Sequence, residues 1–178
     1  MNTRLKTLVL RLFEEHRLMA IATNRPDGWP HATLVGYVND GFLLYSFIAG
    51  NSQKYTNVLR DPRVSIAIGS DATEPLEITG LSLAGKASVV TDPGEFEYVS
   101  RLRLRRYPEY ATSPPVLDET QRTSPPPAAD GIVLLRITSE IISVLDYSKG
   151  FGHSDLITFS DRDLDLHLES RRHLWGGR

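Results

Sequence analysis

The sequence contains no cysteine. This absence excludes disulfide bonds, thiolate metal sites, iron–sulfur clusters and a cysteine nucleophile, and it suits a reducing compartment. No apolar run approaches the roughly 20 residues that a membrane helix needs. No small-residue cleavage site follows an apolar run near residue 1. We therefore expect a cytoplasmic protein that does not enter a membrane.

An excess of charge of either sign is also missing. The 20 Lys and Arg residues nearly balance the 22 Asp and Glu residues, which leaves a formal net charge of −2. Proteins that work on the phosphate backbone of nucleic acid, or on an anionic membrane surface, carry a clear positive excess. We therefore expect no nucleic-acid partner and no membrane partner.

The common catalytic motifs are absent as well. There is no G-x-S-x-G nucleophile elbow and no glycine-rich dinucleotide turn between a strand and a helix. The five histidines include no H-x-x-x-H pair, so no metal site is expected. Asp and Glu are scattered over turns and helix faces, and no pair of them indicates acid–base catalysis. The residues alone assign no catalytic group.

Short strands and a few helices dominate what is present. Apolar residues at helical spacing predict a packing helix over about residues 3–16. Strand patterns over 18–23, 31–38 and 42–47 are separated by two turn signals, Pro26-Asp27-Gly28 and Asn39-Asp40-Gly41. Three strands joined by short turns predict an antiparallel meander.

The same pattern continues to about residue 145. A short helix begins at Asn51 or Ser52 and ends before Pro62, and a helix capped by Asp92 runs to about residue 107. Further strands are predicted over 64–69, 132–137 and 141–145. Residues 77–90 form a strand pair or one bent strand, in which Gly80 and Gly85 mark a bulge or a barrel corner. The fold class is mainly β (α+β), with a barrel-like antiparallel sheet and peripheral helices.

One domain accounts for this length. Six of the 11 prolines fall between residues 108 and 130, which predicts a long Pro-rich loop inserted in the domain. The single domain is expected over residues 1–160, and residues 161–178 form a charged C-terminal tail.

The segment Asn51-Ser52-Gln53-Lys54 has features of a phosphate site. A helix start presents unpaired N–H groups and a partial positive charge, to which Ser52 adds a hydroxyl and Lys54 a cation. The same residues also fit a plain helix cap followed by a solvated lysine. Local sequence alone favours the plain cap.

The order of these motifs carries more information than any one of them. A packing helix is followed by a strand, P-D-G-x-P-H, a strand, a D-G turn and a strand. Then come S-x-K on a helix that ends in D-P-R-V, and a strand with G-K-A. This succession resembles the pyridoxamine 5′-phosphate oxidase-like flavoproteins, the FMN-binding split β-barrels. The matching stretches are 18–38, 42–68 and 83–90, with weaker similarity over 130–159.

The resemblance implies an antiparallel split β-barrel, a homodimer with FMN in a groove between subunits, and an oxidoreductase of unknown small-molecule substrate. In this family the flavin carries the redox chemistry and the protein supplies binding and orientation. The residues that the resemblance places at the cofactor are His31, Ala32, Thr33, Leu34, Val35, Tyr45, Ser46, Ser52, Gln53 and Lys54.

Each group of these residues has its own implied role. Residues 31–35 match the strand that runs along the flavin and its ribityl chain, and His31 is a candidate acid or base if it faces the ring. Residues 45–46 match the end of the next strand, near the phosphate. Ser52 and Lys54 match the phosphate-binding pair, and Gln53 stands where many members carry a basic residue.

Departures from the family pattern leave alternatives open. The end of the chain, residues 173–178, lacks the Arg-containing segment that helps to hold the vitamin B6 phosphate, and Thr79-Gly80 replaces polar or basic residues. Pyridoxamine phosphate is therefore not the expected substrate. Gly150-Phe151-Gly152 looks like a segment of the haem-utilisation branch, with His153 as the candidate ligand. A cofactor-free dimeric binding module is the third hypothesis, and nothing in the residues selects deazaflavin F420.

Overall fold

The computed structural model describes residues 3–69, 72–109 and 131–160. Within these ranges the helices are α1 (Thr3–Glu15), α2 (Gln53–Arg60) and α3 (Pro93–Arg106), with short 3₁₀ turns η1 (Pro75–Glu77) and η2 (Tyr147–Lys149). The strands are β1 (Leu18–Asn24), β2 (Pro30–Gly36), β3 (Val38–Asp40), β4 (Leu43–Ala49), β5 (Arg63–Gly69), β6 (Thr79–Val89), β7 (Ile132–Asp146) and β8 (Ser154–Thr158). The central part of the expected Pro-rich loop, 110–130, and the expected tail, 161–178, lie outside the described residues.

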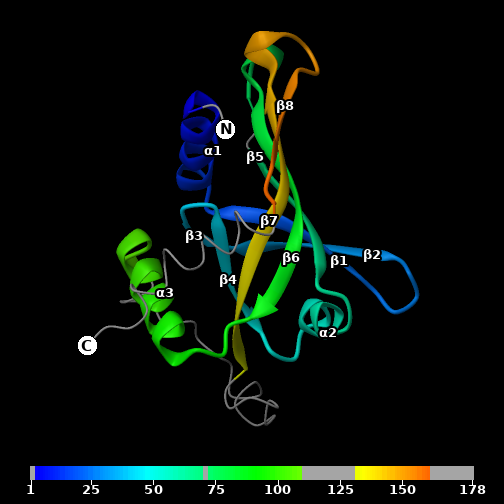
Figure 1. The fold of residues 1–178 in the computed structure, drawn as a ribbon, viewed down its shortest axis with the longest axis vertical. Helices are drawn as coiled ribbons and strands as arrows, with labels where there is room; N and C mark the ends of the chain where they lie inside the picture. The colour runs from blue at the N-terminus through cyan, green and yellow to red at the C-terminus, as the bar shows by residue number, and fades with distance from the viewer. Residues whose placement is uncertain (1–2, 70–71, 110–130, 161–178) are drawn as a thin grey trace.

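All strand pairs of the sheet are antiparallel, in the order β2-β1-β5-β6-β7-β4-β3, and β8 pairs with β7. The long strands β6 and β7 run the length of the molecule, and the three helices lie at its periphery (Figure 1). The sheet curls into a half-barrel, so the expected split β-barrel with peripheral helices is confirmed. None of the described helices is both long and apolar enough to span a membrane.

The strands β2 and β3 replace the single predicted strand 31–38, and the meander is wrong. β2 pairs only with β1, while β3 pairs with β4 at the other end of the sheet order. The chain turns a corner between them at Tyr37, whose hydroxyl donates to the carbonyl of Phe13 (2.9 Å). The side-chain alternation breaks here, because Tyr37 and Val38 are consecutive and both buried. Local alternation could not show that the chain changes sheet edges at this point.

β7 is one strand with a bulge, where the sequence pattern predicts two separate strands. β6 is one strand, and its register with β7 shifts between Ala84, opposite Ile141, and Gly85, opposite Ser139. Glu140 is the extra residue on β7, which makes 132–146 one continuous strand instead of the two predicted. Of the two glycines expected to mark a bulge or a barrel corner, Gly85 lies at the bulge, whereas Gly80 pairs in continuous register with Gly69 and Leu145. The bulge bends the strand pair toward closure of the half-barrel.

Two apolar cores hold the elements together. The inner face of the curled sheet packs against α1, whose buried residues Val9, Leu12 and Phe13 confirm the predicted apolar stripe. A second core lies between α3 and the β3–β4 edge of the sheet, and includes Tyr45, Val99 and Leu134. Asp92 caps α3 as predicted, since its carboxylate accepts the N–H of Glu95 (2.9 Å).

The arginines of α3 do not all face solvent. Arg101 pairs with Glu97 on the surface, 3.3 Å away at i,i+4. Arg106 instead donates to the carbonyls of Phe13 and His16 at the end of α1 and to the Asn39 side chain. A guanidinium at the C-terminus of a helix satisfies its last carbonyls and complements its dipole. Arg106 therefore ties α3 to α1.

Candidate functional site

The start of α2 is built as the sequence suggests. Ser52 is the N-cap: its Oγ accepts the N–H of Tyr55 (3.4 Å) and donates to the carbonyl of Ala49 (2.6 Å). Lys54, in the first turn, is half-buried and has no hydrogen bond or ion pair with any described residue. A helix N-terminus with an unpaired ammonium in its first turn suits an anion.

The Gln53 side chain is held by a hydrogen bond within α2. Its Nε2 donates to Oδ1 of Asn57, one turn further along α2 (2.8 Å). Asn57 is fully buried, and its Nδ2 donates to Oγ1 of Thr23 on β1 (3.0 Å). Thr23 in turn donates to the carbonyl of His31 on β2 (3.4 Å). These hydrogen bonds join the first turn of α2 to the strand that the family resemblance places along the cofactor.

Sequence reasoning missed Asn57 and Thr23. On α2 the polar Asn57 is buried next to Val58, whereas the apolar Leu59 is 61% exposed. The signal that was available is the spacing: Gln53 and Asn57 lie four residues apart, where an amide pair meets on one helix face.

The side chains of β2, the strand expected along the cofactor, alternate between two faces of the sheet. His31, Thr33 and Val35 alternate toward the inside of the half-barrel, while Ala32 and Leu34 point outward, and Leu34 is 70% exposed. Two polar atoms on the inner face, Nδ1 of His31 and Oγ1 of Thr33, are buried and have no partner among the described residues. An unsatisfied buried polar atom costs about 1–3 kcal/mol. This cost would be removed by a ligand, or by water, that hydrogen-bonds at this point.

The next strand does not present the Tyr45 side chain to this site. Tyr45 is fully buried on the α3 side of β4, and its hydroxyl donates to the Glu95 carboxylate (2.9 Å). Burial next to that carboxylate raises the pKa of Tyr45 far above its usual value. Ser46 faces the other side of the strand, where its Oγ donates to the carbonyl of Gly36 (2.9 Å). Both side chains therefore already hydrogen-bond within the protein.

The segment with a haem-branch resemblance forms the turn between β7 and β8. Gly150 and Gly152 have φ of 131° and 78°, which favours glycine at both positions. Nε2 of His153 lies 3.3 Å from the Asp155 carboxylate, which Lys149 also contacts at 2.5 Å. His153 is thus held by its own hairpin. No group of three or more His, Asp or Glu side chains within the described residues could hold a metal ion.

The outer face of the sheet carries no charge over a wide area. Two neighbouring rows of cross-strand partners run over six strands in the order β2, β1, β5, β6, β7 and β8. The first row is Leu34, Ala20, Ala67, Ser82, Ser143 and Leu156, and the second is Ala32, Ala22, Ser65, Ala84, Ile141 and Thr158. Leu34, Leu156 and Ile141 are 70%, 67% and 43% exposed. A large uncharged patch of this kind is typical of an interface.

Comparison with solved structures gives three informative neighbours. A Listeria innocua protein provisionally assigned as a pyridoxamine 5′-phosphate oxidase is 25% identical, with a TM-score of 0.60 over 80% of this chain and 98% of its own. An F420 reductase is 26% identical, with a TM-score of 0.52 over 75% and 94% of the two chains. A haem-binding protein from Mycobacterium smegmatis is 20% identical, with a TM-score of 0.63 over 83% and 55%. The last likeness shows the fold alone.

Comparison with curated proteins gives no match to this sequence. Comparison with family models does: the model described as pyridoxamine 5′-phosphate oxidase matches residues 5–140. This match spans α1 and most of the sheet, and includes β2, α2 and the bulge. The chain therefore belongs to the pyridoxamine 5′-phosphate oxidase family.

Proposed function

We propose that this protein is an FMN-binding flavoprotein, an oxidoreductase that acts on a small molecule as a homodimer. The observation that carries the proposal is the pair of unsatisfied buried atoms, His31 Nδ1 and Thr33 Oγ1. They lie on the strand that hydrogen bonds connect to the first turn of α2, where Lys54 has no partner among the described residues. Proteins of this family bind flavin-type cofactors.

The residues at the start of α2 and on β2 fit FMN. The FMN phosphate would bind the N-terminus of α2, with the Lys54 ammonium as its counter-ion and the Ser52 hydroxyl beside it. His31 and Thr33 would hydrogen-bond the polar ribityl chain or the ring edge. Gln53 would act by fixing Asn57 and the strand, because its amide is already bonded there. When bound, the flavin supplies the redox chemistry, and these residues bind it and orient it.

The homodimer rests on the uncharged outer face. Proteins of this family are commonly dimeric. Two sheets that pack face to face need small or apolar side chains on the facing sides, which the two rows from Leu34 to Leu156 and from Ala32 to Thr158 provide.

Replacing Lys54 with Ala tests the phosphate site. We expect the dissociation constant for FMN to rise about 10- to 100-fold, because one charge-assisted contact is lost. Fluorescence quenching of FMN on titration with protein measures it. Lys6→Ala, which removes an exposed lysine from α1, is the matched control and should bind FMN like the parent chain. Equal affinity of the Lys54 variant and the parent would overturn the phosphate assignment.

The absorption spectrum after incubation with FMN, or with haem, tests the cofactor itself. A two-banded flavin spectrum that survives desalting is the expected result. A Soret band without flavin retention would favour the haem-binding alternative, for which solved structures on this fold include a haem-binding protein, and His153→Ala would then be the first variant. Retention of neither group would contradict the FMN proposal.

Placing a charge on the outer face tests the dimer. Leu34→Asp should raise the dimer dissociation constant at least about 100-fold, because an unpaired carboxylate would be buried between the sheets. Sedimentation equilibrium should report a mass near 19.9 kDa for this variant and twice that for the parent chain. Thr91→Asp, at an exposed position before α3, is the control and should stay dimeric. A mass near 19.9 kDa for the parent chain as well would refute the homodimer.

A further inference from the structure

Three polar side chains form a continuous row between the two parts of the proposed cofactor site. The row begins at Gln53 in the first turn of α2, passes through Asn57 and Thr23, and ends at the backbone of His31 on β2. Asn57 and Thr23 are 0% and 1% exposed, so water does not reach either side chain. A buried polar network in which each member is bonded fixes one arrangement of the elements that it joins.

Each hydrogen bond in this row has a defined direction. Oδ1 of Asn57 accepts Nε2 of Gln53 (2.8 Å), so Nδ2 of Asn57 faces β1 and donates to Oγ1 of Thr23 (3.0 Å). A hydroxyl has a single proton, and that of Thr23 is donated to the carbonyl of His31, 3.4 Å from Oγ1. Thr23 and His31 are also cross-strand partners. The donor at residue 53 therefore sets the direction of the bonds as far as β2.

The far end of α2 is attached to the sheet independently of this row. Arg60 donates to the carbonyl of Asn24 at the end of β1 (2.8 Å), and the Asn24 side chain donates to Asp61 (2.9 Å). Among the described residues, Asn57 makes the hydrogen bond to β1 that lies nearest to the first turn of the helix. Loss of the row would therefore let the first turn shift while the far end of α2 stays attached.

The two ends of the row are the two parts of the site that FMN would bridge. The first turn of α2 carries Lys54, which has no partner in the described part of the chain, and β2 carries the unsatisfied atoms His31 Nδ1 and Thr33 Oγ1. A ligand that contacts both parts binds most tightly when they are already correctly spaced, because binding then orders nothing further.

We propose that Asn57 and Thr23, directed by the Gln53 amide, are positioning residues of the cofactor site. They fix the first turn of α2 relative to β2, and so strengthen cofactor binding without contacting the cofactor. This role rests on the proposed FMN function. It adds two buried residues to that site and requires a hydrogen-bond donor at residue 53.

The test compares FMN with riboflavin, which lacks the phosphate and so cannot bridge α2 and β2. Thr23→Val keeps the side-chain volume but loses the hydroxyl. We expect its dissociation constant for FMN to rise about tenfold, and that for riboflavin to change less than about twofold. Fluorescence quenching of each flavin on titration with protein measures both constants. Equal losses for the two ligands would show local damage to β2 and overturn the positioning role, and so would an unchanged FMN affinity.

Two further variants test the hydroxyl and the donor. Thr23→Ser loses a buried methyl group but keeps the hydroxyl, so it should bind FMN like the parent chain. Gln53→Met keeps the side-chain length but removes the donor, and should weaken FMN binding about three- to tenfold. An FMN affinity of Thr23→Ser as low as that of Thr23→Val would overturn the role of the hydroxyl. An affinity of Gln53→Met equal to that of the parent would overturn the requirement for a donor.

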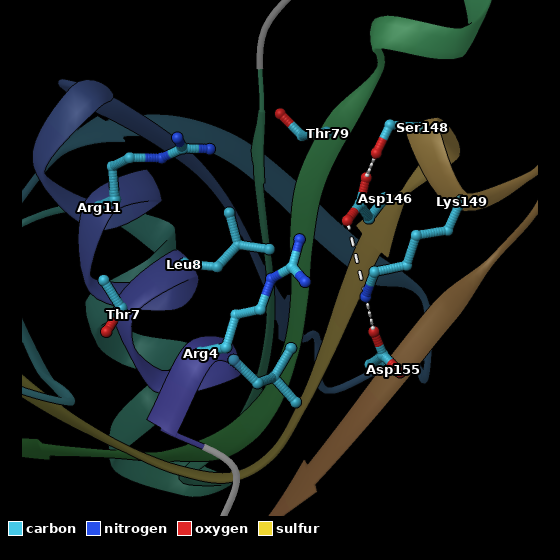
Figure 2. Close-up of a pocket in the computed structure, with 10 residues that line it drawn as sticks. Arg4, Thr7, Leu8, Arg11, Thr79, Asp146, Ser148, Lys149 and Asp155 are labelled. Atoms are coloured by element: carbon cyan, nitrogen blue, oxygen red, sulfur yellow. Dashed lines mark hydrogen bonds and ion pairs between the residues drawn. The ribbon is translucent and has the colours of Figure 1, made fainter.

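Two controls each lose a hydrogen bond outside the row. Asn24→Ala removes the bond to Asp61 at the far end of α2, and Ser148→Ala removes the bond to Asp146 beside the β7–β8 hairpin (2.5 Å), which Figure 2 shows. Both should bind FMN like the parent chain. If both weakened FMN binding as much as Thr23→Val, general loss of stability would explain the effect and the positioning role would be wrong.

Failure of the positioning role and failure of the proposed function give different results. A parent chain that binds no FMN would overturn both. A parent chain that binds FMN, with a Thr23→Val variant that binds it equally well, would overturn the positioning role alone.

Discussion

Gly85→Ala is expected to reduce the free energy of unfolding by at least about 4 kcal/mol, a large part of the total for a domain of this size. A Cβ at this position would lie 2.1 Å from the carbonyl oxygen of Thr138 and 3.1 Å from Cα of Ser139. Both are backbone atoms of β7, so relief would require the central strand pair to separate at the bulge. Urea unfolding monitored by circular dichroism measures the loss, and insoluble expression would be its extreme form.

Gly36→Ala is the matched control for this effect. The nearest atom to a Cβ there is the carbonyl oxygen of Arg17 at 3.9 Å, an ordinary contact. We expect its free energy of unfolding to change by less than about 1 kcal/mol. If Gly85→Ala behaved like Gly36→Ala, the close crossing of β6 and β7 at the bulge would be wrong, and with it the curvature that shapes the half-barrel.

Glu95→Ala is expected to cost about 3–5 kcal/mol of unfolding free energy, because it removes one member of a buried ionic cluster. Glu95 is 2% exposed. Its carboxylate accepts the Tyr45 hydroxyl at 2.9 Å and both its oxygens accept Arg136 Nη1 at 3.1 Å. In the variant, the fully buried Tyr45 hydroxyl loses its acceptor, and the Arg136 guanidinium loses both hydrogen bonds to Glu95. Thermal and urea unfolding measure the loss.

Two further variants separate charge from surface effects. Glu95→Gln keeps an acceptor for Tyr45 but removes the negative charge. Its free energy of unfolding should therefore lie between that of the parent chain and that of Glu95→Ala. Glu97→Ala, on the same helix, breaks only an exposed pair with Arg101 and should change the unfolding free energy by less than about 1 kcal/mol. Equal effects of Glu95→Ala and Glu97→Ala would contradict the cluster.

The cluster also shows that the Tyr45 side chain bonds within the protein, while the role that the family resemblance implies for Tyr45 and Ser46 stays a prediction. The matching strand is present, but α3 covers its Tyr45 side and contributes Glu95. Only the pairing of a helix after β6 with strands β4 and β7 shows this. The proposed cofactor site therefore uses side chains of the α2 start and of the inner face of β2.

Local elements could be predicted because their causes are local. The stripe of α1 repeats with the helix period, and Ser52 and Asp92 cap the helices that follow them. The turn ending in Gly28, with φ of 86°, and the turn ending in Gly41, with φ of 60°, lie where glycine favours the left-handed region. The phosphate candidates Ser52 and Lys54 followed from the same helix start.

Other features depend on which distant segments meet. Strand alternation tells which side chains share a face but not which strand lies next to which, and so it could not place β2 and β3 at opposite ends of the sheet order. The hydrogen bond of the buried Asn57 to Thr23 and the unsatisfied atoms of His31 and Thr33 also arise only when the sheet has curled.

The sequence by itself determined the mainly β class, the helix boundaries, the turns and the family motifs, because neighbouring residues decide backbone conformation and inward or outward direction. The tertiary structure alone decided the strand order and the buried partners of Tyr45 and Asn57. These features depend on contacts between residues tens of positions apart. Such contacts form only when the whole half-barrel packs, and they leave no local periodicity in the sequence.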